Sequence, residues 1–143
     1  MKETLLRNVL NKYTNNHFII HQLQFGSVKV VVPVLSVRKQ PAHVYVTDNG
    51  DGTYLLSDQR DLMVDAYGMM DSVSIYPYRN AFELLSRGYY PTITTSDDSF
   101  VQRVKHVDDL AASMFAFAGF IAHAMNLAQM EKDRDDSTVP HTY

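Results

Sequence analysis

The chain of 143 residues contains no cysteine, so disulfide bonds, thiolate metal sites and a cysteine nucleophile are excluded. This composition is compatible with a reducing compartment, and we expect a cytoplasmic protein. The chain also has no excess of positive charge, because 13 lysines and arginines stand against 16 aspartates and glutamates, for a net charge of −3. It therefore lacks a general attraction for phosphate, and broad nucleic-acid binding is not expected.

Several patterns that carry known chemistry or targeting are also missing. The sequence has no Gly-x-Ser-x-Gly elbow, phosphate loop or dinucleotide fingerprint, so we expect no cofactor. No N-terminal segment has the charged start, apolar run and cleavage site of a secretory signal. The segment from Leu110 to Met130 is nearly free of charge and about as long as a bilayer span, but His123 and Gln129 interrupt it. We therefore do not favour a membrane span.

The composition is typical of one globular domain. Hydrophobic residues make up 45% of the chain, and no internal repeat or linker divides it. The length is sufficient to bury one core and too short for two. We expect a single α+β domain over 1–132 and a flexible tail over 133–143.

Hydrophobic periodicity predicts the order of helices and strands. The expected helices cover 3–13, a segment from about Arg60, 80–88, and a long apolar segment from about 100 to 132 that Ser96 or Ser99 caps. The expected strands cover 17–25, 27–35, 42–48 and 53–58, with a short one possible between 89 and 95. These elements predict a small antiparallel sheet of about four strands, with helices packed on one face and the long C-terminal helix as the largest apolar element.

The strongest local signal is the turn sequence Asn49-Gly50-Asp51-Gly52. Asn-Gly and Asp-Gly supply the positive backbone angles that tight hairpins need, so a hairpin is expected over 42–58. Pro33 cannot donate a hydrogen bond to a neighbouring strand, and it predicts an edge or a bulge in the strand that contains it.

Carboxylates gather around this hairpin and the following helix start: Asp48, Asp51, Asp58, Asp61 and Asp65. One interpretation is a catalytic site in which Asp48, Asp51 and Asp58 act with His43. The interpretation we favour is structural, since Asp48 and Asp51 suit turns and Asp58 suits a helix cap. The spacing does not match a calcium loop, because Gly50 and Gly52 stand where ligands are needed.

The remaining histidines do not complete a metal site. His17 and His21 have the spacing of helical zinc ligands, but in a strand their rings lie roughly 13 Å apart. His106 and His123 fall far apart on the long helix. We therefore expect no bound metal.

Tyrosines and arginines form a second candidate site, which we call the aromatic patch: Tyr76, Tyr78, Arg79, Arg87, Tyr89 and Tyr90. Tyrosine and arginine are common anchors of protein interfaces, so we expect this patch to bind a protein. Stacking on single-stranded nucleic acid is an alternative.

The long helix is apolar on two sides, which predicts a homodimer. The residues expected at the dimer interface are Phe115, Ala118, Gly119, Ala122 and Met125. The alternative is burial of both sides within one subunit by the short helices.

The order of motifs resembles an uncharacterised family of small proteins carried by phages, prophages and other mobile elements. The resemblance lies in VKVVVPVL, in HVYVTDNGDGTYLLSDQRDLMVDAYGMMDSV and in the apolar segment 98–130. Leu-Leu-Ser-Asp at 55–58 matches a Leu-Thr-Asp motif at the end of a strand pair, and Tyr67-Gly68 matches a helix end. The resemblance implies a closing C-terminal helix over 98–130, and it assigns no catalytic residue.

These observations favour a small non-enzymatic interaction protein of a phage or mobile element, which binds and modulates a host protein. The alternative is a small metal-dependent hydrolase or nuclease that uses the region of Asp48, Asp51 and Asp58. A single-strand-binding module is a third hypothesis.

Overall fold

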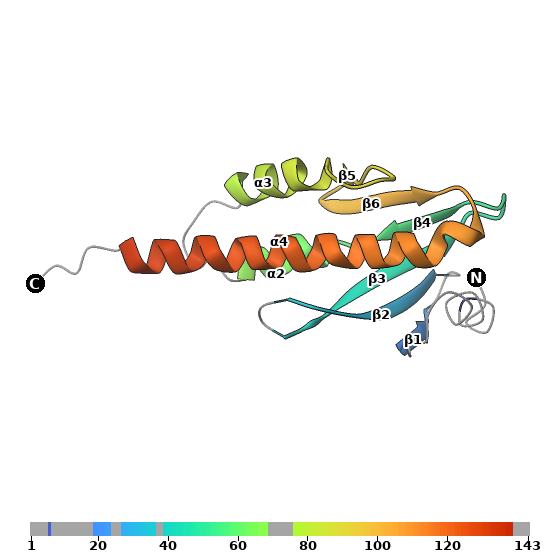
Figure 1. Ribbon diagram of the computed structural model, residues 1–143, viewed down its shortest axis with the longest axis horizontal. Coiled ribbons are helices and arrows are strands. Elements are labelled where there is room, and N and C mark those ends of the chain that lie inside the picture. Colours follow the sequence, from blue (N-terminus) through green and yellow to red (C-terminus); the bar gives the residue numbers. More distant parts are fainter. Residues whose placement is uncertain (1–5, 7–18, 24–26, 37–38, 69–75, 139–143) are drawn as a thin grey trace, which may run out of the picture.

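The computed structural model describes residues 6, 19–23, 27–36, 39–68 and 76–138. In these residues one six-stranded antiparallel sheet packs against a long helix, as Figure 1 shows, which confirms the α+β class. The strands, in sheet order, are β1 (Ile19–Gln22), β2 (Ser27–Leu35), β3 (Pro41–Asp48), β4 (Tyr54–Ser57), β6 (Ser99–Val104) and β5 (Thr94–Ser96). The helices are α2 (Asp61–Gly68), α3 (Tyr76–Ser86) and α4 (Leu110–Thr138), and the short 3-10 turn η2 (Val107–Asp109) precedes α4.

One face of the sheet is apolar and buried. Side chains along β2 and β3 alternate between buried and half-buried positions, as expected for strands with one face on a core. Register keeps the buried positions together: Val28 lies opposite Val46, which lies opposite Leu56, and all three are fully buried. This continuous apolar face packs against α4.

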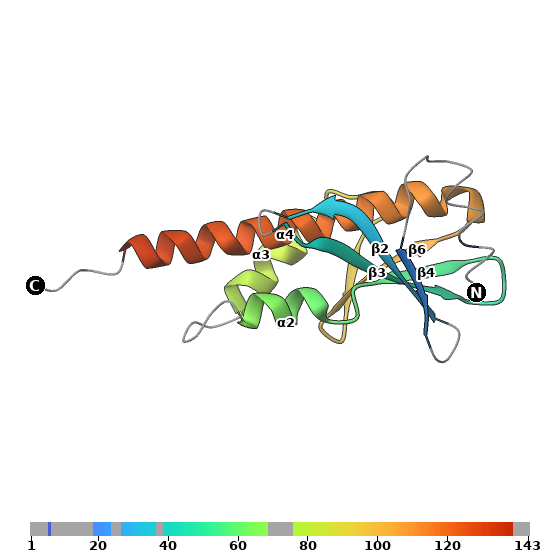
Figure 2. The ribbon, with the colours of Figure 1, turned by 90° about the horizontal axis from the view of Figure 1, so that it is seen from below.

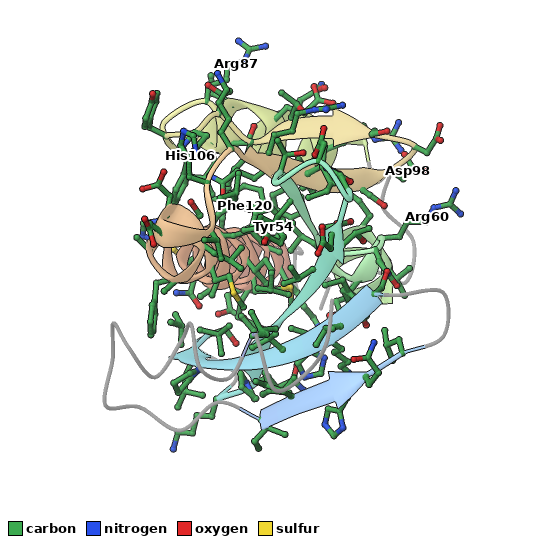
Figure 3. All side chains as sticks on the ribbon, turned by 90° about the vertical axis from the view of Figure 1, so that its right-hand side faces the viewer. Tyr54, Arg60, Arg87, Asp98, His106 and Phe120 are labelled. Carbon is green, nitrogen blue, oxygen red and sulfur yellow. The ribbon has the colours of Figure 1, made fainter. Side chains whose placement is uncertain are left out.

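Helix α4 supplies the other half of the core. Met114 and Phe117 are fully buried, as the predicted apolar stripe requires. Phe120 packs edge to face on Phe100 of β6, with ring centroids 5.0 Å apart. Figure 3 shows the side chains of α4, Phe120 among them, directed toward the sheet. Helix α4 also contacts β3 and β2, which lie far from it in the sequence.

The prediction that residues 99–104 begin the long helix was wrong. This segment forms β6, in which Phe100, Gln102 and Val104 are buried while Val101 and Arg103 point outward. That period of two is the strand pattern, and pairing with β4 stabilises it. With β6 and β5, the sheet has six strands rather than about four.

The bounds of other strands and helices are explained by residues near them in the sequence. The hairpin over 42–58 is confirmed, and the register of β2 shifts between Val32 and Leu35, around Pro33. Helix α3 begins at Tyr76, before the predicted 80, because Pro77 falls in the first turn, where a missing N–H costs nothing.

The two ends of the chain give different outcomes. Helix α4 continues to Thr138, past the predicted end at 132, so residues 133–138 are helical rather than part of a flexible tail. The predicted helix over 3–13 lies outside the described residues, apart from Leu6, which is buried in the core.

Helices α2 and α3 both pack against α4, and Figure 2 shows α4 extending beyond them. The segment Val107–Met130 is long and apolar enough to cross a membrane by length and composition. However, 56% of its most apolar window is buried inside the molecule, and the core helix of a soluble protein passes the same test. The helix is therefore weak evidence either way, and the cytoplasmic localisation stays a prediction.

The structure changes which of the residues expected at the homodimer interface are accessible to a second subunit. Ala118, Ala122 and Met125 are buried within the single chain, whereas Phe115 and Gly119 stay half-buried. Of the five residues expected at the dimer interface, Phe115 and Gly119 are thus the two that stay partly accessible to a second subunit. The homodimer stays a prediction.

We expect light scattering in detergent-free buffer to give the mass of a dimer at micromolar concentration, and Gly119→Arg to reduce it to that of a monomer. The added side chain would prevent the close approach of two helices at their crossing. No heavy atom lies within 4 Å of a Cβ built at Gly119, so the fold itself should tolerate the change. A monomeric mass for the unmodified protein would refute the dimer.

We expect Gly50→Ala and Gly52→Ala each to lower the free energy of unfolding by about 1–2 kcal/mol, because an L-residue is strained at positive φ. These glycines have φ of 83° and 86°, and no heavy atom lies within 4 Å of an added Cβ, so the effect isolates the backbone. Gly119→Ala is the matched control and should be neutral or stabilising, because alanine favours a helix. Equal effects at all three positions in urea denaturation would contradict the proposed role of the turn.

Candidate binding cleft

Strand β3 is twice as long as its neighbour β4, and this mismatch leaves part of the sheet edge open. Residues Tyr45–Asp48 pair with Tyr54–Ser57, while the first half of β3 pairs only with β2. After Ser57 the chain turns into α2 instead of continuing beside β3. Among the residues that the structure describes, the first half of β3 thus has a strand on one side only.

The hydrogen-bonding pattern indicates which backbone groups face the open side. The Asn49 amide donates to the Thr53 carbonyl over 3.0 Å, so these two residues form a hydrogen-bonded pair. Because such pairs alternate along an antiparallel ladder, Thr47 and Tyr45 have the same role. The next position in this series is His43. Its backbone N–H and C=O are therefore directed to the side that β4 leaves open.

A cleft of about 410 Å³ borders this open edge, between β3, α2 and α4. Its lining consists of Val34, Ser36, Gln40, Pro41, Ala42 and His43 from the β2–β3 hairpin, Asp58, Asp61, Leu62 and Asp65 from the start of α2, and Ile121, Ala122 and Met125 from α4. The α4 wall is apolar, whereas the α2 wall carries carboxylates. We call this hollow the β3 cleft.

Asp58 forms part of the β3 cleft lining but is fully buried, and it joins three elements. Its Oδ2 accepts a hydrogen bond from the Leu62 amide (3.1 Å), and its Oδ1 accepts from the amides of Arg60 (3.4 Å) and Phe100 (2.8 Å). The bond from Leu62 caps the first turn of α2, as the sequence predicts, and the bond from Arg60 lies in the turn just before the helix. The bond to Phe100 connects this cap to β6, which the sequence did not predict.

The backbone next to Asp58 is strained. Gln59 and Arg60 have positive φ angles of 48° and 70°, which non-glycine residues rarely adopt. The carboxylate of Asp58 accepts hydrogen bonds from the Arg60 amide within this turn and from the Leu62 amide after it, and these bonds compensate for the strain. Burial raises the pKa of Asp58 to about 6, although its three amide donors favour the charged form.

A second group of polar side chains lies on the face of the sheet opposite α4. The Tyr45 hydroxyl donates to Asp61 Oδ2 over 3.0 Å, and burial together with this bond raises the pKa of Tyr45 to about 12. Burial lowers the pKa of His43 below 6.5, helped by Lys29 and opposed by Asp61 and Asp65. Burial thus disfavours the charged form of His43, and the other ionisable residues that line the cleft are the carboxylic acids Asp58, Asp61 and Asp65.

The other carboxylates of the proposed catalytic group lie in the β3–β4 turn and do not line the cleft. Asp48 Oδ1 accepts from the Gly50 amide (2.9 Å), and Asp51 Oδ1 accepts from the Thr53 amide (3.0 Å). These are the turn roles that the sequence favoured. Within the described part of the chain, no three histidine, aspartate or glutamate side chains are grouped so that they could hold a metal ion.

The described members of the aromatic patch differ in their surroundings, and the predicted binding role of the patch stays a prediction. Arg79 forms an ion pair with Asp98, and Tyr89 packs on Phe120 with ring centroids 5.6 Å apart. Arg87 extends away from the body of the molecule (Figure 3), and Tyr90 is 92% exposed. The side chains of the other two members, Tyr76 and Tyr78, lie outside the described part of the structure.

Tyr90 borders a second hollow of about 570 Å³. The basic residues Arg103 and Lys105 line this hollow together with His106 and Asp109. Its mixed charge and open position offer no arranged set of groups comparable to the β3 cleft.

Sequence reasoning identified Asp58, Asp61, Asp65 and His43 as candidates but missed their common position and the α4 wall. One feature of the sequence could have indicated the open end of β3. The sequence predicts strands of unequal length on the two sides of the Asn49–Gly52 turn once Asp58 is assigned to the helix cap, so the longer strand must have an unpaired end.

We expect Asp58→Ala to lower the free energy of unfolding by about 3 kcal/mol or more, because it leaves several buried amide donors without an acceptor. A helix cap alone would contribute only about 1 kcal/mol. Asp133→Ala, at an exposed position on α4, is the control and should change stability by less than about 0.5 kcal/mol.

The comparison with Asp58→Asn tests the raised pKa. A folded-state pKa of about 6, above the usual 3.8, means that the folded protein binds this proton more tightly than the unfolded chain. Relative to Asp58→Asn, the unmodified protein should therefore lose stability as the pH rises from about 4 to about 6. Urea denaturation that shows a constant difference over this range would contradict the burial of the carboxylate.

Comparisons with known proteins identify no relative: no family model, no curated protein and no solved structure matches this chain.

Proposed function

We propose that this protein is a non-enzymatic interaction protein that binds a segment of another protein in the β3 cleft. The observation that carries the proposal is a strand edge at His43 that no described strand pairs with on the β4 side, and that opens into a cleft with one acidic and one apolar wall. A strand edge supplies main-chain hydrogen bonds, and flanking walls supply side-chain specificity, which together are the elements of peptide recognition.

The catalytic alternative has less support. Its four residues are divided between the turn, which holds Asp48 and Asp51, and the cleft, which holds His43 and Asp58. Both oxygens of Asp58 accept hydrogen bonds from backbone amides, so this carboxylate serves the fold. A general base or metal ligand needs an oxygen directed at the reacting group.

The family resemblance of the sequence extends this proposal to the nature of the partner. Proteins of phages and mobile elements act in a foreign cell, so the partner we propose is a protein of the host. Binding in the β3 cleft would then modulate that protein by occupying one of its segments.

Site-specific photo-crosslinking tests the proposed function. We expect p-benzoylphenylalanine at Gln40, an exposed residue of the cleft, to form a discrete cross-linked product in an extract of the native host cell. The same group at Ser96, an exposed residue of the distant edge strand β5, should not form it. Products that are identical at both positions, or absent at both, would contradict binding in the cleft.

A further inference from the structure

The chemistry of the β3 cleft indicates which kind of segment it binds, an inference that rests on the proposed function. Two properties are relevant: the charge of the cleft and the side of the sheet on which each wall lies. The ionisable side chains that line the cleft are Asp58, Asp61, Asp65 and His43. A ligand with positive charge complements this set, whereas an acidic ligand is repelled.

The carboxylates and the apolar wall lie toward opposite faces of the sheet. Ala42 and Val44 are buried on the face that packs against α4, where Ile121 and Met125 line the cleft. Tyr45 lies on the other face, and its hydroxyl reaches Asp61. A strand placed beside β3 would therefore have apolar surroundings on one face and carboxylates on the other.

Successive side chains of a strand point to opposite faces, so this arrangement selects for an alternating sequence. Residues directed toward α4 would be apolar, and residues directed toward Asp61 and Asp65 would be cationic. The His43 backbone groups would hold such a strand in register, because they face the open side of the ladder.

We propose that the β3 cleft binds an extended basic segment of its partner, in which lysine or arginine alternates with apolar residues, as an added strand beside His43. Charge-assisted hydrogen bonds from the basic side chain to Asp61 and Asp65 would give specificity. The apolar neighbour would pack on Ile121 and Met125.

Fluorescence anisotropy with synthetic peptides tests this proposal. The probes are labelled Val-Lys-Val-Lys-Val-Thr, its acidic counterpart Val-Glu-Val-Glu-Val-Thr, and Lys-Lys-Val-Val-Val-Thr, which has the same composition without alternation. We expect the alternating basic peptide to bind at least tenfold more tightly than either of the others. N-methylation of its central amides should weaken binding by about tenfold, because the added strand loses hydrogen bonds to the sheet edge.

Variants of the protein locate the bound peptide. The double change Asp61→Asn and Asp65→Asn should weaken binding of the basic peptide by at least tenfold, whereas Asp133→Asn, which removes the same charge from an exposed site outside the cleft, should leave it unchanged. Asparagine at 61 keeps an oxygen for Tyr45, and thermal melting verifies that each variant is folded.

Four results would overturn the proposal. Three of them are equal affinity for the acidic peptide, binding that the double variant does not alter, and a protein dimer that the basic peptide dissociates, which would assign the cleft to a second copy of the chain. The fourth is failure of all peptides to bind. If Gln40 still cross-links a partner in that case, the proposed function stands and only the inferred chemistry of the segment fails. If neither is observed, both fail.

Discussion

The buried carboxylate of Asp58 is the constraint on which the site depends. It accepts hydrogen bonds from the start of α2 and from β6, at the point where β4 ends. Because β4 ends here, it does not pair with the first half of β3. A buried charge that is fully hydrogen-bonded thus positions α2 as a wall and leaves a sheet edge open.

An open edge is normally a hazard, because it can pair with any exposed strand. Here the edge is recessed between α2 and α4 rather than presented on a flat surface. Carboxylates on one wall disfavour acidic strands, and the α4 wall disfavours polar ones. The same groups that restrict unwanted pairing would select the partner we propose, since specificity is a difference between affinities.

The elements that the sequence predicts correctly are those whose structure depends on residues close together in the chain. The period of two in β2 and β3, the Asn-Gly turn and the Asp58 cap each act over a few residues. Residues 99–104 were assigned to a helix because an apolar segment follows them, but pairing with β4 makes them a strand. Long-range pairing overrides local preference in such cases.

The site was predicted in part for the same reason. The sequence identifies Asp58, Asp61 and His43 as candidate site residues because they are close together in the chain. It gave no indication that Ile121 and Met125 would complete the cleft, since that contact depends on how α4 crosses the sheet. Nor could it show that Ala118 and Ala122 are buried within one subunit.

The most direct test of the open edge is amide hydrogen exchange at His43, with Val44 as an internal reference. The ladder directs the Val44 amide toward β2 and the His43 amide toward the cleft, so in the free protein His43 should exchange much faster. Saturation with the cross-linked partner or the basic peptide should slow exchange at His43 and leave Val44 unchanged. A His43 amide that is already protected in the free protein, or that stays unprotected at saturation, would contradict the account.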